Sequence, residues 1–135
     1  MSSTPKKSVN HNPLPKRKKK KSLNIEMIDI IKESLDDAKA EDIVVIDIRG
    51  KSSIADYMVV ASGRSHRHVG AVADQISKAL HENGFKKGRI EGLPHCDWVL
   101  VDAGDVIIHI FRPEVREFYN IEKMWSAEFE DETNA

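Results

Sequence analysis

The sequence lacks the features by which several large classes of protein are recognised. It has one cysteine, Cys96, in 135 residues, which excludes an internal disulfide framework and is typical of a protein of the reducing cytoplasm. It has no apolar run near the roughly 20 residues that span a bilayer. Its Lys-rich start resembles neither a secretory signal nor an amphipathic, Arg-rich transit peptide. We therefore expect one cytoplasmic domain with tails and without a membrane partner.

Acidic residues are absent from the first 22 residues, which hold eight of the 21 basic residues. The remainder has 13 basic and 22 acidic residues, a net charge of −9. Because residues 1–22 carry too few apolar side chains to offset the entropy of ordering, we predict a disordered basic tail there. The run from Lys16 to Lys21 either contacts RNA weakly through counterion release or is simply solvated. The acidic body favours a basic protein surface as the partner of the folded domain.

Apolar periodicity predicts an α/β domain over residues 23–125. Apolar positions three or four apart indicate helices, and short runs rich in β-branched residues indicate strands, the first of them buried. The predicted elements are a helix at 23–40, strands at 42–48 and 57–61, a helix at 66–83 with Ser65 as N-cap and Gly84 as its stop, strands at 89–91, 98–101 and 106–111, and a helix from Pro113. This order predicts a mixed five-stranded sheet flanked by helices. The acidic residues 126–135 are expected to fray.

Residues 91–125 are the most informative part of the chain. Two apolar runs flank the turn at 102–105, and Gly104 can take the positive φ that such a hairpin turn needs. Polar residues interrupt strands whose other residues favour burial, which indicates an edge or face that meets a partner. These polar residues are Asp97, Asp102, Asp105 and His109.

Four of the large aromatic residues in this region suggest a protein interface, because interfaces use aromatic anchors within a polar rim. For Trp98, beside Asp97, we favour a surface position, whereas Phe111 and Trp125 suit the core and the surface equally. Tyr119 is the fourth of these aromatic residues. His109 points away from the face of its strand neighbours, so it is either a hydrogen-bonded core histidine or an interface residue, and we favour the interface.

A catalytic alternative has weaker support. The turn at 63–65 precedes a helix and offers backbone N–H groups to an anion, and Asp97, Asp102 and Asp105 would then be metal ligands of a nucleotidyltransferase-like enzyme. No phosphate-binding loop accompanies these acids, and Asp is common beside turns for local reasons. A single cysteine without a Cys/His pair gives no zinc motif. We therefore predict no catalytic residue, metal or cofactor.

Six blocks within residues 23–125 resemble the ribosomal silencing factor family (RsfS, Iojap-like). In order, they are 50–56 (GKSSIAD), 67–69 (RHV), 91–92 (EG), 97–102 (DWVLVD), 104–111 (GDVIIHIF) and 116–125 (REFYNIEKMW). The resemblance implies a nucleotidyltransferase-like fold without the catalytic acids. It also implies a repressor that docks on the large ribosomal subunit through the fourteenth large-subunit ribosomal protein, blocks joining of the small subunit and lowers translation under nutrient limitation. Some members form homodimers when free, and organellar relatives act in large-subunit assembly, which leaves an assembly factor as the alternative.

The resemblance also implies which residues bind the partner. They are Glu91, Asp97, Trp98, Asp102, Asp105 and His109 in the hairpin region, Arg67 and His68 at the start of the second helix, and Tyr119 and Glu122 near the C-terminus. The acids would meet Arg or Lys on the ribosomal protein, and Trp98 would supply apolar burial between them. The Lys-rich tail departs from the family pattern, and its contact with ribosomal RNA stays open.

Overall fold

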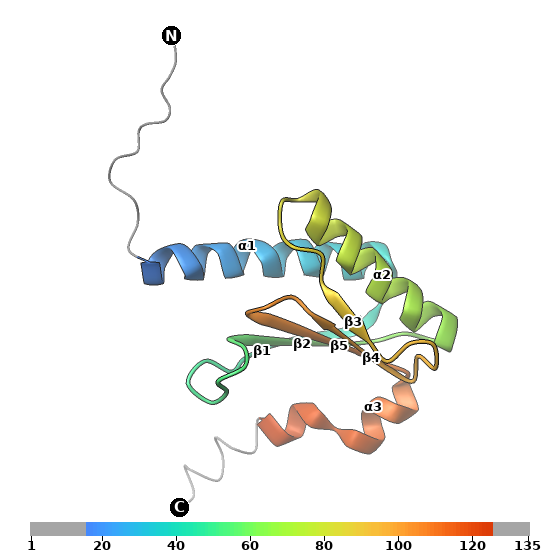
Figure 1. Cartoon of the computed structure of the whole chain (residues 1–135). Coiled ribbons are helices and arrows are strands. Elements are labelled where there is room, and N and C mark those ends of the chain that lie inside the picture. Colours follow the sequence, from blue (N-terminus) through green and yellow to red (C-terminus); the bar gives the residue numbers. More distant parts are fainter. Residues whose placement is uncertain (1–15, 126–135) are drawn as a thin grey trace, which may run out of the picture.

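The structure, a computed structural model, describes residues 16–125. The predictions for residues 1–15 and for the acidic segment 126–135 lie outside these described residues. In chain order the elements are α1 (Lys16–Asp37), β1 (Glu41–Asp47), β2 (Tyr57–Ser62), α2 (His66–Glu82), β3 (Arg89–Glu91), β4 (Trp98–Asp102), β5 (Val106–Phe111) and α3 (Pro113–Tyr119) (Figure 1). A further helical stretch covers residues 121–125. None of the helices in this part of the chain is long and apolar enough to cross a membrane.

The five strands form one mixed sheet in the order β1-β2-β5-β4-β3, which confirms the predicted architecture. β2 and β5 are parallel, and the chain between them crosses over through α2, β3 and β4. The other three neighbouring pairs are antiparallel. The β4–β5 hairpin has the predicted turn, in which Gly104 has a φ of +89° and the Ala103 N–H donates to the Val106 carbonyl oxygen at 3.0 Å.

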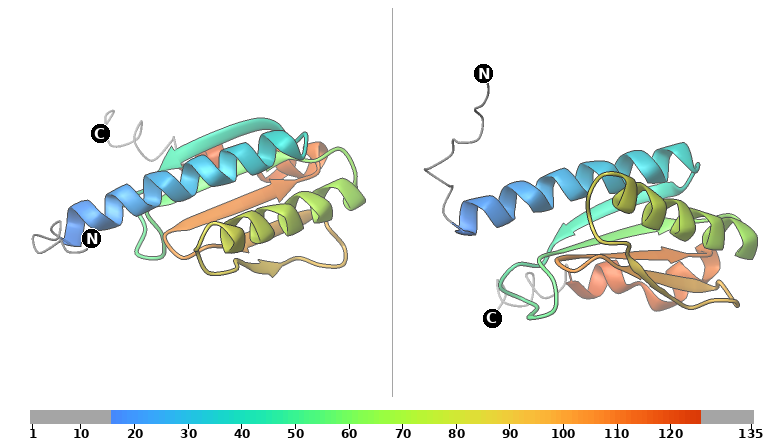
Figure 2. Two further views of the ribbon diagram at one scale, coloured as in Figure 1. Left: turned by 90° about the horizontal axis from the view of Figure 1, so that it is seen from above. Right: turned by 45° about the horizontal axis from the view of Figure 1, so that its top comes forward.

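Helices cover both faces of the sheet. α1 and α2 lie over one face and α3 under the other (Figures 1 and 2). The larger core is on the α1–α2 side, where Ile31, Leu35, Ile76 and Ile108 are fully buried. The smaller core on the α3 side contains Phe111, which is fully buried, so this aromatic residue belongs to the core. At seven residues α3 is only about 10 Å long, so it covers part of its face and leaves the rest of the sheet open.

The caps of α2 follow the sequence prediction. The Ser65 hydroxyl accepts a hydrogen bond from the backbone N–H of His68 at 3.1 Å, as an N-cap does. At the other end Gly84 has a φ of +89°, and the Phe85 N–H donates to the Leu80 carbonyl oxygen at 2.9 Å. These bonds fix the ends of the helix that packs across β4 and β5.

The first helix begins at Lys16, seven residues before the predicted start at Leu23. The predicted disorder of residues 16–22 is therefore wrong. Lys and Arg are good helix formers, and adding a residue to an existing helix is far easier than nucleating one. The packed part of α1, where Met27, Ile31 and Leu35 are buried, supplies that nucleus.

The first strand is an edge strand, which corrects the prediction that it is buried. Its burial is low along its length, and Val44 and Val45 are 36% and 38% exposed. The sequence analysis inferred burial from composition. β-branched residues are enriched in edge strands as well as in central strands, so composition does not distinguish the two. An irregularity in the pairing between Glu41 and Val44, with Asp42 at a φ of +53°, disrupts this edge as a β-bulge does.

Candidate protein-binding surface

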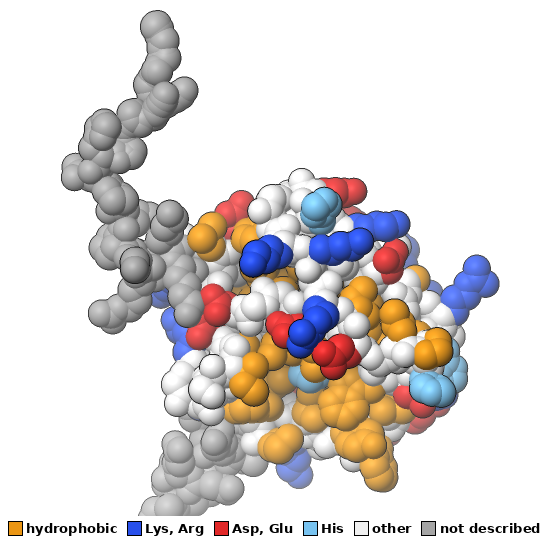
Figure 3. All heavy atoms as spheres, viewed as in Figure 1, with side chains coloured by type: hydrophobic (Ala, Val, Ile, Leu, Met, Phe, Trp, Pro, Cys, Tyr) orange, Lys and Arg blue, Asp and Glu red, His pale blue; other side chains and the backbone are white. Residues whose placement is uncertain are grey.

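The open part of the sheet on the α3 side carries most of the predicted site. Trp98, Leu100 and Asp102 alternate along β4 and so share one face. The strand register places Leu100 beside His109 of β5 on one side and beside Glu91 of β3 on the other. Figure 3 shows apolar side chains gathered over this region, between the β3–β4 edge and α3.

Aromatic side chains from β4, β5 and α3 form the centre of this region. Trp98, Leu100 and His109 are half-buried, whereas Phe118 is 81% and Tyr119 53% exposed. We call these five residues the aromatic surface. Large apolar side chains this exposed and this close together are typical of a site that a partner covers.

Ring contacts make the aromatic surface a rigid platform. The Trp98 ring centroid lies 4.8 Å from that of buried Phe111 and 5.0 Å from that of Tyr119. Phe118 in turn contacts Tyr119 edge to face at 5.0 Å. Offset and tilted contacts at these distances are favourable between rings. Trp98 is thus anchored below by the core and above by α3, and it is ordered before any partner arrives.

His109 is held neutral within this platform. The indole Nε1–H of Trp98 donates to His109 Nδ1 at 3.0 Å, which requires Nδ1 to be unprotonated. Burial lowers the pKa of His109 from 6.5 to about 4, because the surrounding apolar groups cannot solvate a charged imidazole. His109 is therefore a half-buried residue with a hydrogen-bond partner, and it orients the indole of Trp98.

A groove of about 530 Å³ runs beside the aromatic surface, between the loop before β4 and α3. Trp98, Phe118 and Tyr119 line it on the apolar side. Asp97 and Glu114 line it as well, and they place carboxylates at its margin. The groove thus combines apolar walls with acids, a composition that suits a basic protein segment with apolar side chains.

Asp97 is tied into an exposed ion network at the start of β4. The Arg112 guanidinium donates to its Oδ1 at 3.0 Å, and His66 Nε2 lies 2.7 Å from the same oxygen. These two groups, Arg112 first, hold the pKa of the Asp97 carboxyl below its usual value. Arg112 also pairs with Glu114. The network orients Asp97 while its side chain stays about half exposed.

Glu122 lies in the helical stretch at 121–125, where it pairs with Arg116 of α3. Both of its oxygens accept from the Arg116 guanidinium, at 2.9 and 2.8 Å, and Arg116 also donates to the Ser62 hydroxyl at 2.7 Å. Arg116 is only 11% exposed and lowers the pKa of the Glu122 carboxyl. This clamp fixes α3, and with it Tyr119, against the end of β2.

The remaining predicted site residues lie away from the aromatic surface. His68 is on the α2 side, where its Nδ1 accepts from the Arg64 N–H at 2.9 Å and its Nε2 lies 2.7 Å from the Ala38 carbonyl oxygen. It therefore joins the end of α1 to the start of α2. Arg67 is exposed in the first turn of α2. Asp105 lies in the hairpin turn, and its backbone carbonyl accepts from residues 56 and 57.

Leu100, Phe118 and Arg112 are the functional candidates that the sequence analysis missed. Strict alternation with Trp98 along β4 was a usable signal for Leu100. Phe118 lies within the block at 116–125 and Arg112 just outside the blocks, but their exposure and partners follow from how α3 packs on the sheet, which the sequence does not show.

The acids of the catalytic alternative do not converge. Asp97 precedes β4 and Asp102 ends it, so their Cα atoms are roughly 16 Å apart along an extended strand. Metal ligands must lie within a few Å of one ion. In addition, Asp102 accepts from the Gly104 N–H at 3.0 Å, as a turn residue does, and lies 3.9 Å from the Arg89 guanidinium. Asp97 and Asp102 are therefore too far apart to share one metal ion, and each has its own local partners.

Comparison with known proteins gives consistent matches along most of the chain. The family model described as "Ribosomal silencing factor during starvation" matches residues 20–135. A ribosomal silencing factor of Zymomonas mobilis is 51% identical over 123 residues, which are 90% of this chain and 91% of that protein. A Mus musculus protein named "Mitochondrial assembly of ribosomal large subunit protein 1" is 35% identical over 78% of this chain and 48% of its own length. A crystal structure of a Chromobacterium violaceum protein has a TM-score of 0.72 at 39% identity, covering 75% of this chain and 84% of that one.

Proposed function

This chain belongs to the ribosomal silencing factor family, and we propose that it represses translation by binding the large ribosomal subunit and blocking joining of the small subunit. The family description names starvation, so we propose that repression operates when nutrients are limited. The contact we propose is with the fourteenth large-subunit ribosomal protein. A bound domain of this size on the face that meets the small subunit would exclude that subunit sterically, without chemistry.

The aromatic surface is the observation that carries this proposal. Trp98 is fixed by ring contacts and by a hydrogen bond, and the exposed rings of Phe118 and Tyr119 extend the apolar area around it. Acids surround this area, with Asp97 at the groove and Glu91 and Asp102 on the same sheet face. A basic ribosomal protein surface would complement it: apolar burial would supply affinity, and the acids would supply orientation and a faster encounter.

A role in large-subunit assembly is the second candidate, because the Mus musculus relative is named for that process. The same docking event would serve both roles. Repression requires that the bound protein block subunit joining, whereas assembly requires only that it bind an immature subunit. Deleting the protein and examining whether immature large subunits accumulate separates the two.

Four subsidiary proposals concern the setting of this activity. We propose that the protein acts in the cytoplasm and is not an enzyme, so calorimetry should detect no heat on adding nucleotides with Mg²⁺. We propose that Lys16–Lys21 adds a weak electrostatic contact with ribosomal RNA. We also propose that the free protein forms a homodimer, which analytical ultracentrifugation over a range of concentrations would detect.

Binding to the isolated fourteenth ribosomal protein tests the docking surface directly. Phe118→Ala is the cleanest variant, because the side chain is 81% exposed and its loss leaves the core intact. Trp98→Ala removes the anchor, and Glu91→Arg reverses a charge on the same face. Each should weaken binding at least about tenfold, since hot-spot truncations and buried charge contacts are worth 2 kcal/mol or more.

Matched controls come from elsewhere on the molecule. Ile54→Ala truncates an apolar side chain that is 73% exposed, in the loop between β1 and β2. Asp74→Arg reverses an exposed acid on α2, across the sheet from the aromatic surface. Both should bind like the parent protein. Normal binding by Phe118→Ala and Trp98→Ala would show that the aromatic surface is not the docking site.

A further inference from the structure

The groove beside the aromatic surface is lined by two carboxylates that share one guanidinium. Arg112 donates to Asp97 Oδ1 at 3.0 Å and pairs through its other terminal nitrogen with Glu114. Because both acids bind the same cation, they lie together at one margin of the groove, and both line it. The side chain of Arg112 is 26% exposed, whereas those of Asp97 and Glu114 are 52% and 64% exposed. The guanidinium is therefore the inner member of this network, and the carboxylates are the outer ones.

This network carries one more negative charge than positive charge. Two carboxylates face one guanidinium, and His66, which lies 2.7 Å from Asp97, is counted as neutral. The contacts with Arg112 use Asp97 Oδ1 and Glu114 Oε2. A carboxylate has about four acceptor positions, so each acid can accept further N–H groups. A second cation on the groove side would balance the charge of the network.

An exposed aromatic ring lines the same groove. The rings of Trp98 and Tyr119 also line it, but they lie 5.0 Å apart, and Trp98 also covers Phe111. Phe118 is 81% exposed, and its ring contact with Tyr119 is edge to face. A ring that makes such a contact keeps a face open to a ligand. A cation over the face of an aromatic ring is attracted by the negative charge density of that face.

We propose that the groove takes a single arginine side chain of the ribosomal partner, with its guanidinium stacked on Phe118 and its N–H groups on Asp97 and Glu114. The proposal deepens the docking surface proposed above and rests on it. A guanidinium is planar and carries several N–H donors in a fixed fork, so it can stack on a ring and bind carboxylates at the same time. A lysine ammonium is a compact, strongly hydrated charge without a planar face. The groove therefore discriminates arginine from lysine.

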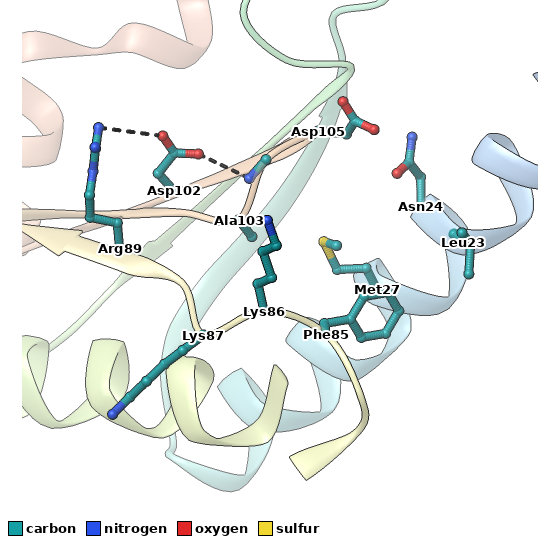
Figure 4. Close-up of a pocket in the computed structure, with 11 residues that line it drawn as sticks. Leu23, Asn24, Met27, Phe85, Lys86, Lys87, Arg89, Asp102, Ala103 and Asp105 are labelled. Carbon is teal, nitrogen blue, oxygen red and sulfur yellow. Dashed lines mark hydrogen bonds and ion pairs between the residues drawn. The ribbon is translucent and has the colours of Figure 1, made fainter. Parts of the chain in front are cut away.

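The larger cavity on the α1 side of the sheet does not suit a cation. It has a volume of about 920 Å³ and is lined by Lys86, Lys87 and Arg89. Its Asp102 already accepts from the Gly104 N–H at 3.0 Å and lies 3.9 Å from Arg89 (Figure 4). The basic side chains of this cavity would repel an arginine. The carboxylates beside the aromatic surface, which outnumber their cation, attract it instead.

Nuclear magnetic resonance of the full, isotope-labelled chain with N-acetyl-arginine amide tests the groove without the ribosome. The indole Nε1–H signal of Trp98, assigned with the variant Trp98→Phe, should shift saturably, because this ring lines the groove. N-acetyl-lysine amide should bind roughly threefold or more weakly, because an ammonium cannot stack on a ring and bind two carboxylates as a guanidinium does. The citrulline amide, which has the same shape as arginine but no charge, should cause no saturable shift.

Single variants separate the ring from the charge. Phe118→Leu keeps an apolar side chain and removes the ring, and it should weaken arginine amide binding about fivefold. Glu114→Gln keeps the size of the side chain and removes its charge, and a loss of about fivefold is expected because a hydrogen bond to a charged group is stronger than one to a neutral group. Glu117→Gln is the matched control, since it neutralises an exposed acid of α3 outside the groove and should bind like the parent protein. Equal shifts with the arginine and citrulline amides, or an unchanged affinity in either groove variant, would overturn the arginine site.

The fourteenth ribosomal protein links the groove to its partner. Each surface arginine of that protein would be changed singly to lysine. One such change should weaken binding to the parent chain roughly threefold or more, and it should have a smaller effect on Phe118→Leu, which lacks the ring. If the parent chain binds the ribosomal protein but no single arginine matters, the arginine site is overturned and the docking proposal stands. If the parent chain does not bind the ribosomal protein at all, the docking proposal is overturned, and with it the partner assigned to the groove.

Discussion

The burial of His109 makes the stability of this protein depend on pH in a defined window. The folded protein holds His109 neutral down to a pKa of about 4, whereas the same residue in the unfolded chain takes up a proton near 6.5. Between these values the unfolded state binds more protons, so the free energy of unfolding falls as the pH falls. This difference in pKa corresponds to a loss of at most about 3 kcal/mol in the free energy of unfolding. The actual loss is smaller because His109 is only partly buried.

Protonation would also disturb the aromatic surface. The Trp98 indole N–H donates to His109 Nδ1, and a protonated Nδ1 cannot accept. Below the pKa of about 4 the indole loses this partner, and Trp98 is then held by ring contacts alone. The pH dependence therefore reports on the same contact that orients the proposed docking surface.

Urea unfolding of His109→Gln between about pH 7 and pH 4.5 measures this contribution. The glutamine amide oxygen can accept from Trp98 but does not titrate, so the variant should lose about 2 kcal/mol less stability than the parent protein over this range. The other histidines and the carboxylates contribute equally to both proteins and cancel. Ile54→Ala, which changes an exposed side chain that does not titrate, should keep the parental dependence. An identical pH dependence in His109→Gln and the parent protein would refute the burial argument.

Three further predictions concern the elements that support the site, each measured by urea unfolding. Arg116→Met leaves the Glu122 carboxylate without its bidentate partner and should cost about 2 kcal/mol; an unchanged midpoint would show that the pair contributes nothing. Gly92→Ala should lower the free energy of unfolding far more than Gly104→Ala, because a Cβ at 92 would lie 2.3 Å from a carbonyl oxygen of β4. At 104 a Cβ meets open space, and only the φ of +89° is strained. Equal losses in the two variants would contradict this geometry. Ser65→Ala should cost about 1 kcal/mol through loss of the α2 N-cap, and Ser65→Thr should retain most of it.

Local signals were sufficient for much of the fold. The hairpin turn at 102–105 and the caps of α2 depend on one or two residues each, such as Gly104 and Ser65, and the structure confirms them. The position of a strand in the sheet and the start of a helix depend on tertiary packing, and local sequence signals did not predict them. The run at 41–47 is β-branched like a central strand, yet it lies at the sheet edge because only β2 pairs with it. The start of α1 at Lys16 depends on a nucleus around Met27, Ile31 and Leu35, further along the helix.

In the candidate site, too, residue type and motif predicted some residues, whereas the roles of others depend on tertiary packing. Trp98 and Tyr119 were predicted from residue type and motif, and the structure brings them into contact at 5.0 Å. The ion pair between Glu122 and Arg116 was not predictable from the sequence. A motif does not tell whether its carboxylate binds a partner protein or another residue of the same chain. Phe118 lies in the same motif block as Tyr119, but the block does not indicate that its side chain is exposed, because this exposure follows from how α3 lies on the sheet.

Subunit joining with purified components tests the central claim most directly. Large and small subunits would be mixed with the parent protein, Phe118→Ala or Trp98→Ala, and the joined ribosomes quantified by sedimentation, with Ile54→Ala as the control. The account predicts that the parent protein and Ile54→Ala cosediment with the large subunit and reduce joining in proportion to dose, while the two aromatic variants do neither. Joining that is unaffected by bound parent protein would contradict the steric mechanism, and inhibition by the aromatic variants equal to that of the parent protein would contradict the assigned surface.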